Sequence, residues 1–318
     1  MSRLENSKTI LVTGGLGFIG SHFIEKCLNL GHKIINIDKM TYAANKDLKF
    51  KGSYACIQSD ISEVKDIPNC DFIVNFAAES HVDNSISESI NFLNSNIKGV
   101  YNLLEIIKNR SIQSALNAYK YKMPIFFQIS TDEVFGDIDE GFFKENDRHH
   151  SSNPYSATKS AAEQLVFAWA RTYNIPFLMT RTTNNYGPRQ YPEKLIPCAI
   201  TKILKNEKVP IHGDGSYVRN WIHVQDNVDA IIEVMDKGKI NNVYHIASEE
   251  EYSVNDIVKI ICEEVGVKFE DYADYSTNRS GADLRYALDY DKIKELGWTQ
   301  KRHLRESLRE VIESYKGG

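Results

Sequence analysis

The sequence is poor in cysteine, and its cysteines are not arranged for disulfides or zinc. All five lie far apart and none belongs to a C-x-x-C pair: Cys27, Cys56, Cys70, Cys198 and Cys262. Disulfide frameworks and zinc sites use paired, closely spaced cysteines. We therefore expect free thiols in a reducing, cytoplasmic compartment, and no metal site.

Long apolar runs and an excess of positive charge are also absent. Residues 1–8 are polar and glycines interrupt the apolar run that follows, so we expect neither a signal peptide nor a membrane span. With 38 Lys and Arg against 43 Asp and Glu, the chain offers no basic surface for nucleic acid or for an anionic membrane. A hydrophobic fraction of 42% in 318 residues predicts an ordinary globular protein.

Residues 1–181 alternate short β-branched or aromatic runs with longer amphipathic stretches, which is typical of a parallel sheet flanked by helices. The predicted fold class is α/β, with a doubly wound parallel sheet of the Rossmann type in a domain over residues 1–181. We expect strands at Thr9–Thr13, Lys33–Ile37, Tyr54–Gln58, Phe72–Phe76, Ile125–Ser130 and Phe177–Arg181. We expect helices at Gly17–Leu30, Ile86–Asn109 and Pro154–Tyr173.

Residues 182–318 have shorter elements, and their loops carry His, Arg, Lys and Tyr. We expect this smaller part to bind mainly the substrate. Residues 222–246 again resemble a core strand and helix, so some segments of this part should return to the Rossmann core.

A glycine-rich turn, Thr13–Gly20, follows the first expected strand and opens the first expected helix. Gly14, Gly17 and Gly20 let the backbone approach a pyrophosphate, whose charge suits the helix N-terminus. Asp38 ends the second strand at about the 20-residue offset of the acid that binds ribose hydroxyls. A carboxylate there would repel a 2′-phosphate, so we predict NAD rather than NADP. Further contacts with NAD are expected at the ends of other strands: Asp60, Ile61, Ala77 and Ala78.

Tyr155 and Lys159 stand four residues apart in the first turns of an expected helix, so their side chains share one face. A nearby ammonium and a positively charged nicotinamide could together lower the pKa of a tyrosine from about 10 towards 7. The phenolate could then take the proton of an alcohol while a hydride leaves its carbon.

The segment Ser130–Gly136 places two adjacent carboxyl groups, Asp132 and Glu133, after a strong strand. Ligands of open parallel sheets bind at the carboxyl ends of the strands. A simple dehydrogenase does not need such a pair, whereas an elimination needs one protonated and one ionised group at the same pH. The alternative is that the two carboxyl groups only cap the next turn.

Taken together, these motifs resemble the extended short-chain dehydrogenase/reductase superfamily, and several runs resemble the dTDP-glucose 4,6-dehydratase family within it. The resemblance extends from Thr9 to about Leu288. The runs are Thr41-Tyr42-Ala43, Ala77–Asp83, Thr131-Asp132-Glu133, Asn184–Pro188 and Pro192–Pro197.

The resemblance implies a redox-neutral elimination on a nucleotide-diphosphate hexose. Tyr155 would deprotonate the 4-hydroxyl while NAD takes the hydride of carbon 4, with Thr131 bound to that oxygen and Lys159 holding the ribose of the cofactor. Glu133 would remove the proton of carbon 5, Asp132 would protonate the departing 6-hydroxyl, and the hydride would return to carbon 6. The family adds cofactor contacts at Phe18, Ile19, Lys39, Thr41, Ser80, Tyr155 and Lys159, and substrate contacts at His81, Thr131, Asn185, Lys194, Leu195, Arg219 and Arg279.

Two alternatives stay open. Asn84 stands where the family has arginine, Ser280 replaces a proline, and residues 249–254 depart from the nucleotide-binding loop, so dTDP-glucose and UDP-glucose are both candidate substrates. A UDP-galactose 4-epimerase-like enzyme shares the glycine turn and the tyrosine–lysine pair but has no use for the two carboxyl groups. The superfamily also implies a homodimer through the helices expected at Ile86–Asn109 and Pro154–Tyr173.

Overall fold

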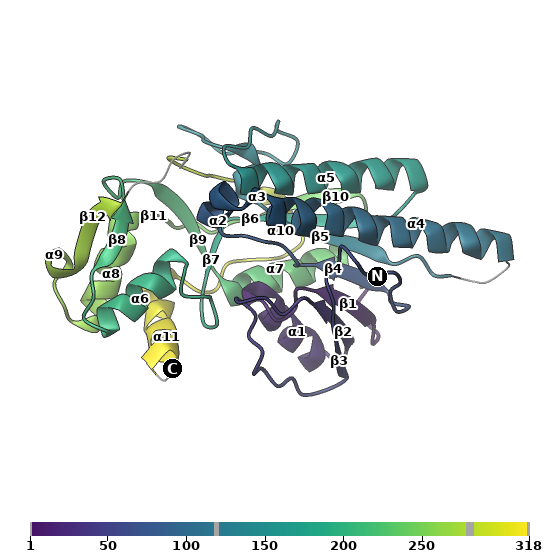
Figure 1. The fold of residues 1–318 in the computed structure, drawn as a ribbon, viewed down its shortest axis with the longest axis horizontal. Helices are drawn as coiled ribbons and strands as arrows, with labels where there is room; N and C mark the ends of the chain where they lie inside the picture. The colour runs from purple at the N-terminus through teal and green to yellow at the C-terminus, as the bar shows by residue number, and fades with distance from the viewer. Residues whose placement is uncertain (1, 118–120, 278–282, 317–318) are drawn as a thin grey trace.

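The structure, a computed structural model, describes residues 2–117, 121–277 and 283–316. Its largest element is a seven-stranded parallel sheet in the order β10-β6-β5-β4-β1-β2-β3 (Figure 1). The predicted α/β fold with a doubly wound Rossmann sheet is confirmed. The strands are β1 (Thr9–Thr13), β2 (Lys33–Asp38), β3 (Tyr54–Gln58), β4 (Phe72–Asn75), β5 (Ile125–Thr131), β6 (Phe177–Thr182) and β10 (Asn242–Ile246).

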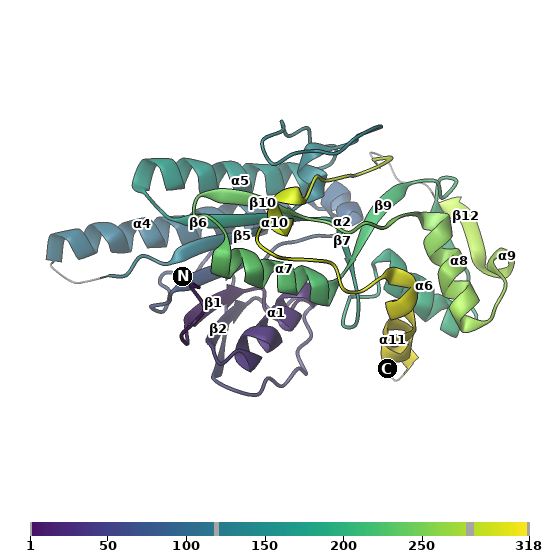
Figure 2. The same cartoon turned by 180° about the vertical axis from the view of Figure 1, so that it is seen from behind.

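Helices cover both faces of this sheet. α1 (Phe18–Asn29) and α7 (Val224–Lys237) lie on one face, and α4 (Gly99–Asn117) and α5 (Pro154–Tyr173) lie on the other (Figures 1 and 2). Because the strands are buried from both sides, most of them are nearly continuous apolar runs in the sequence.

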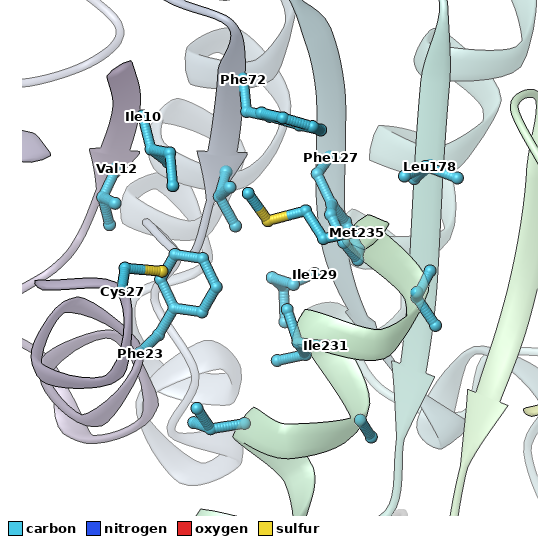
Figure 3. Close-up of a cluster of buried hydrophobic side chains, with 14 of the residues drawn as sticks. Ile10, Val12, Phe23, Cys27, Phe72, Phe127, Ile129, Leu178, Ile231 and Met235 are labelled. Atoms are coloured by element: carbon cyan, nitrogen blue, oxygen red, sulfur yellow. The ribbon is translucent and has the colours of Figure 1, made fainter. Parts of the chain in front are cut away.

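The core on the first face is built from side chains of α1, α7 and the strands. Phe23 and Cys27 of α1 lie beside Ile231 and Met235 of α7, around Phe127 of β5 (Figure 3). All five side chains are fully buried. Each large apolar side chain that is removed from water in this way contributes about 1.5–3 kcal/mol to folding.

The strands expected from the sequence agree with β1 and β3 at both ends, and the others differ by one residue at the C-terminal end. The helix expected over Ile86–Asn109 is not continuous. It consists of α2 (Val82–Ser87), α3 (Ser89–Phe92), a π-helical turn η1 (Leu93–Lys98) and then α4. Apolar periodicity does not reveal such a wide turn, so the prediction of one helix was wrong.

The π-helical turn contains Asn96, whose side chain links two distant segments of the chain. Its side-chain amide donates to the backbone carbonyl of Glu79 at 3.0 Å and to the hydroxyl oxygen of Thr158 at 2.9 Å. It also accepts from the backbone N–H of Glu79 at 2.9 Å. The wide turn therefore ties the segment that follows β4 to the first turns of α5.

A smaller part of the chain packs beside the end of the sheet where β4 and β5 finish (Figure 1). It contains a three-stranded sheet, a two-stranded sheet and its own apolar cluster between α6, α8 and α11. Its elements are β7 (Asn184–Tyr186), α6 (Leu195–Leu204), β8 (Val209–His212), β9 (Val218–His223), β11 (Glu251–Ser253), α8 (Val254–Val265), α9 (Phe269–Tyr272), β12 (Ala273–Thr277) and α11 (Leu304–Lys316). The short helix α10 (Asp291–Lys294) lies instead beside β10 of the main sheet.

Two elements from residues 182–318, β10 and α7, belong to the Rossmann part. β10 pairs in parallel with β6, and α7 packs on the same face as α1. Across the residues that the structure describes, no helix is both long enough and apolar enough for a membrane crossing.

Candidate active site

The glycine loop lies between β1 and α1 and packs against the end of β4. Gly14 has a φ of +68°, and a Cβ on it would stand 2.6 Å from the Cα of Ala77. A Cβ on Gly20 would stand 2.6 Å from the carbonyl oxygen of Gly14. Neither position leaves space for a side chain, so the loop stays flat against the sheet at the N-terminus of α1, as a pyrophosphate site requires.

Asp38 ends β2 beside this loop and is buried. Its carboxylate accepts hydrogen bonds from the backbone N–H groups of Leu16 and Met40, both at 2.8 Å. Each carboxylate oxygen retains a second lone pair that can accept from a hydroxyl group. The neighbouring Lys39 is paired with Asp60, its Nζ lying 2.9 Å from Oδ2, so its charge is already balanced by a carboxylate.

One cavity of about 340 Å³ joins the glycine loop to the start of α5. Its lining contains all the residues predicted to bind NAD and all those predicted to be catalytic. The glycine cradle and the acid at the end of β2 fit a dinucleotide with a free 2′-hydroxyl. The predicted NAD-binding and catalytic residues that line this cavity are Gly14, Gly17, Phe18, Ile19, Gly20, Asp38, Lys39, Thr41, Asp60, Ile61, Ala77, Ala78, Ser80, Thr131, Asp132, Glu133, Tyr155 and Lys159.

A second cavity of about 230 Å³ adjoins the first and is lined by residues of the smaller part. Glu133, Asn185 and Lys194 line both cavities. The second cavity adds the predicted substrate residues His81, Leu195 and Arg219. The predicted residues Arg279 and Ser280 lie outside the described residues.

The start of α5 holds Tyr155 and Lys159 on its buried face. Asn153 caps the helix, its side-chain oxygen accepting from the backbone N–H of Ser156 at 2.9 Å. Lys159, whose exposed fraction is 6%, donates from Nζ to the carbonyl oxygen of Ile129 in β5 at 2.7 Å. Burial lowers the pKa of Lys159 to about 8.

The pKa of Tyr155 differs from the sequence expectation. It is raised, first by burial and then by the charges of Glu133 and Asp132, while a hydrogen bond with Thr131 lowers it. Lys159, which the sequence suggested would lower this pKa, is not among the groups that shift it in the protein without ligands. A phenolate can form here only when further positive charge enters the cavity.

Asp132 and Glu133 form the first turn of η2 (Asp132–Phe135), directly after β5. Thr131 caps this turn by accepting from the backbone N–H of Glu133 at 3.3 Å, and it donates to Oδ1 of Asp132 at 3.1 Å. Asp132 is 3% exposed, and its Oδ2 has no hydrogen-bond partner among the described residues.

The two carboxyl groups experience different surroundings. Burial and then the charge of Glu133 raise the pKa of Asp132 to about 8. Burial also raises the pKa of Glu133, but Lys194, Arg219 and a hydrogen bond with Asn153 oppose that rise. The pair can therefore hold its proton on Asp132, while the cations and the hydrogen bond beside Glu133 favour the ionised form of that carboxyl group.

The second cavity presents positive and polar groups. Arg219 of β9 stacks on the ring of Tyr286, with its guanidinium carbon 4.3 Å from the ring centroid. Lys194 caps α6 and donates to the carbonyl oxygen of Ser80 at 2.8 Å. Oδ1 of Asn185 is a buried acceptor without a partner among the described residues, which costs about 1–3 kcal/mol unless a ligand supplies a donor.

Two loops and helix α2 are joined at this site by a contact that was not predicted. The hydroxyl group of Tyr42 donates to Oε2 of Glu193 at 3.0 Å and accepts from Nδ2 of Asn84 at 3.2 Å. We call this group the Tyr42 clasp. Thr41 and Glu193 line the first cavity, so the clasp joins two of its walls. Tyr42 and Glu193 stand in runs that resemble the family, and Asn84 departs from its pattern, but nothing in the sequence indicated that the three side chains meet.

The fold, the glycine loop, Asp38 and the tyrosine–lysine pair together define an extended short-chain dehydrogenase/reductase. Within that class, the family model for GDP-mannose 4,6 dehydratase matches residues 11–311. The chain belongs to this family. The predicted relation to the dTDP-glucose 4,6-dehydratases is confirmed by this match together with full-length relatives of that name.

Individual relatives agree with this assignment. The chain is 41% identical to the low-salt glycan biosynthesis protein Agl12 of Haloferax volcanii, over 97% of this chain and 98% of that protein. It is 40% identical to a dTDP-glucose 4,6-dehydratase of Haemophilus influenzae, over 96% of this chain and 97% of that protein. The crystal structure of DesIV, a dTDP-glucose 4,6-dehydratase of Streptomyces venezuelae with NAD and TYD bound, superimposes with a TM-score of 0.90 at 32% identity, covering 98% of this chain and 97% of that one.

The raised pKa of Asp132 predicts a pH-dependent cost to folding. Between about pH 4 and pH 8 the folded protein holds a proton on Asp132 that the unfolded chain releases, so stability falls as the pH rises through this window. Asp132→Asn should remove the cost, so that its unfolding free energy relative to the parent increases from pH 4 to pH 8 by on the order of 1–5 kcal/mol.

Urea denaturation at both pH values measures this difference. Asp139→Asn, at an exposed carboxyl group, is the matched control and should show no trend with pH. An Asp132→Asn difference that is the same at pH 4 and pH 8 would contradict the prediction.

Proposed function

We propose that the chain is an NAD-dependent nucleotide-sugar 4,6-dehydratase that converts dTDP-glucose or UDP-glucose to the 4-keto-6-deoxy sugar and water. The observation that carries this proposal is that Asp132 and Glu133 line the same cavity as Tyr155 and Lys159. The family assignment and the dTDP-glucose 4,6-dehydratase relatives support it.

NAD would bind along the first cavity. The glycine loop and the N-terminus of α1 would hold the pyrophosphate, Asp38 would accept from the ribose hydroxyls of the adenosine half, and Lys159 would hold the other ribose. When bound, NAD supplies a hydride acceptor for carbon 4 of the sugar and a hydride donor for carbon 6.

Tyr155 would take the proton of the 4-hydroxyl of the sugar, and Thr131 would hydrogen-bond to the same oxygen. Because burial and the two carboxyl groups raise the pKa of Tyr155, this base depends on the positive charge of Lys159 and of the bound cofactor. The base is therefore ready only in the loaded site.

Elimination follows from the two carboxyl groups of η2. A ketone at carbon 4 acidifies the proton on carbon 5, which Glu133 would remove as the ionised member of the pair. Asp132, whose pKa is raised to about 8, would give its proton to the 6-hydroxyl so that it departs as water. A 4-epimerase would only turn and reduce the ketone again, so a buried acid and base do not favour that alternative.

The smaller part, mainly over residues 182–318, would bind the rest of the substrate. Lys194 and Arg219, together with Arg279, would hold the diphosphate. His81, Asn185 and Leu195 would contact the sugar from the second cavity. Because the sequence departs from the family's nucleotide-binding loop, the base of the substrate's nucleotide can be either thymine or uracil in this proposal.

We further propose a homodimer through the surface of α2, α3 and α4. Ile86, Ile90, Leu93 and Tyr101 are all exposed. They lie on four consecutive helical segments, α2, α3, η1 and α4. An exposed apolar surface of this kind, alongside α5, suits an isologous helix-bundle interface.

The activity itself is tested with the purified protein. Incubation with dTDP-glucose or UDP-glucose, without an added reductant, should give a 4-keto-6-deoxy product with its absorbance in alkali, and the ratio of kcat/KM values should identify the base. Formation of the galactose epimer alone would end the dehydratase proposal.

Glu133→Gln should retain NAD binding and the oxidation of carbon 4 but lose water elimination, because an amide cannot remove the proton of carbon 5. Product formation should fall by about 10²–10⁴-fold, while absorbance at 340 nm reports the reduced cofactor. Glu140→Gln, at an exposed carboxyl group, is the control. Product formation at the parent rate in the Glu133 variant would show that the assigned role is wrong.

Leu93→Glu should convert the dimer to a monomer, because it places a charge in the proposed apolar interface. Sedimentation equilibrium gives the mass of the assembly. Leu30→Glu is the matched control, since Leu30 is 49% exposed and Leu93 is 45% exposed. A parent protein that sediments as a monomer would refute the interface.

A further inference from the structure

α5 carries a buried carboxylate that the proposed reaction does not use. Glu163 has no exposed surface and lies one helical turn after Lys159, so both side chains project from the same face of α5. A buried carboxylate needs a compensating charge close by.

Arg181 of β6 provides that charge. Its Nε lies 3.0 Å and 3.1 Å from the two carboxylate oxygens of Glu163, and its NH2 lies 2.6 Å from Oε2. The remaining guanidinium donors bind the carbonyl oxygen of Glu145 at 2.9 Å, His149 at 3.0 Å and His245 at 3.3 Å. With every direction occupied, the carboxylate of Glu163 has one fixed position.

The neighbouring histidines do not add charge to this group. Burial lowers the pKa of His149, and burial together with the Arg181 charge lowers the pKa of His245 to about 3. Burial thus favours the neutral form of both histidines, and the carboxyl group of Glu163 is paired with the guanidinium group of Arg181.

Lys159 faces few other charges. Its Nζ is bonded to a neutral carbonyl group of β5, and burial favours its uncharged form. On the η2 side, Asp132 and Glu133 act on Tyr155, which stands one turn before Lys159. Within the described part of the chain, Glu163 is the one charged side chain that shifts the pKa of Lys159, and it opposes the effect of burial.

We propose that Glu163 is a positioning residue that keeps Lys159 protonated, with Arg181 fixing the carboxylate behind it. This role rests on the proposed function, in which the ammonium of Lys159 favours the Tyr155 phenolate. The protein thus places a positive charge in a dry cavity by setting a negative charge one turn further along the same helix.

The pKa of Lys159 can be measured without turnover. Protein labelled with ¹³C at the lysine ε-carbons should show one resonance that titrates near pH 8, and this resonance should be absent from Lys159→Met. In Glu163→Gln its midpoint should fall by about one pH unit or more. Glu163→Asp retains the charge, so its midpoint should stay closer to that of the parent.

Glu163→Gln leaves the buried charge of Arg181 without its partner, which could destabilise the fold. A second variant is therefore needed to separate this effect from the effect on Lys159. Glu163→Gln combined with Arg181→Gln removes both charges, and its Lys159 midpoint should also fall. An unchanged midpoint in either folded variant overturns the proposal, and so does failure of both to fold, which would make the role of Glu163 structural.

The pH profile of kcat gives a separate readout. Loss of charge on Lys159 should narrow the active pH range of Glu163→Gln, whereas a merely structural defect should lower the maximum without moving either limb. The two proposals fail in different ways: a parent without dehydratase activity refutes the proposed function, while an unmoved lysine resonance refutes the role of Glu163.

Discussion

Three buried ionisable groups, Asp132, Tyr155 and Lys159, lie with the half-buried Glu133 where β5 meets α5, and the free-energy cost of burying charge governs the rest of the site. Burial moves the pKa of Asp132 up to about 8 and that of Lys159 down to about 8. In water the pKa values of a carboxylic acid and an amine differ by several units, but in this site the pKa values of Asp132 and Lys159 lie in the same range. Hydrogen bonds from the surrounding backbone stabilise the elements that carry these groups: Asn153 caps the start of α5, and Thr131 caps the turn that follows β5.

The same cost determines when Tyr155, the proposed base, can lose its proton. Nearby carboxyl groups and burial raise the pKa of its phenol, so the protein without ligands holds it protonated. Glu133 and Lys194 line both cavities, so whatever occupies one cavity changes the electrostatic environment of the other. The proposed chemistry at Tyr155 is therefore coupled to ligand binding through charge.

Much of the Rossmann part could be predicted because its signals are local. The glycine turn, Asp38 and the Tyr155–Lys159 spacing are read within a few residues, and the strands are apolar runs bounded by turns. The π-helical turn at Asn96 could not be predicted, because its cause is a contact with Thr158 on a distant helix. The pairing of Glu163 with Arg181 joins a helix to a strand in the same way, and the direction of the Tyr155 pKa depends on burial that no motif displays.

The return of the chain to the main sheet has a consequence for how this enzyme can be re-engineered. β10 pairs with β6, and α7 shares its core with α1, so residues 224–246 belong to the Rossmann part, although residues 184–223 and 251–277 on either side form the smaller part. The chain returns to this core once more, where Ile293 of α10 and Trp298 pack in the same apolar cluster. Cutting the chain once near residue 182 would strip an edge strand and half of one helical layer from the sheet. A chimaera with a relative's specificity must therefore exchange several separate inserts and leave α7 and β10 in place between them.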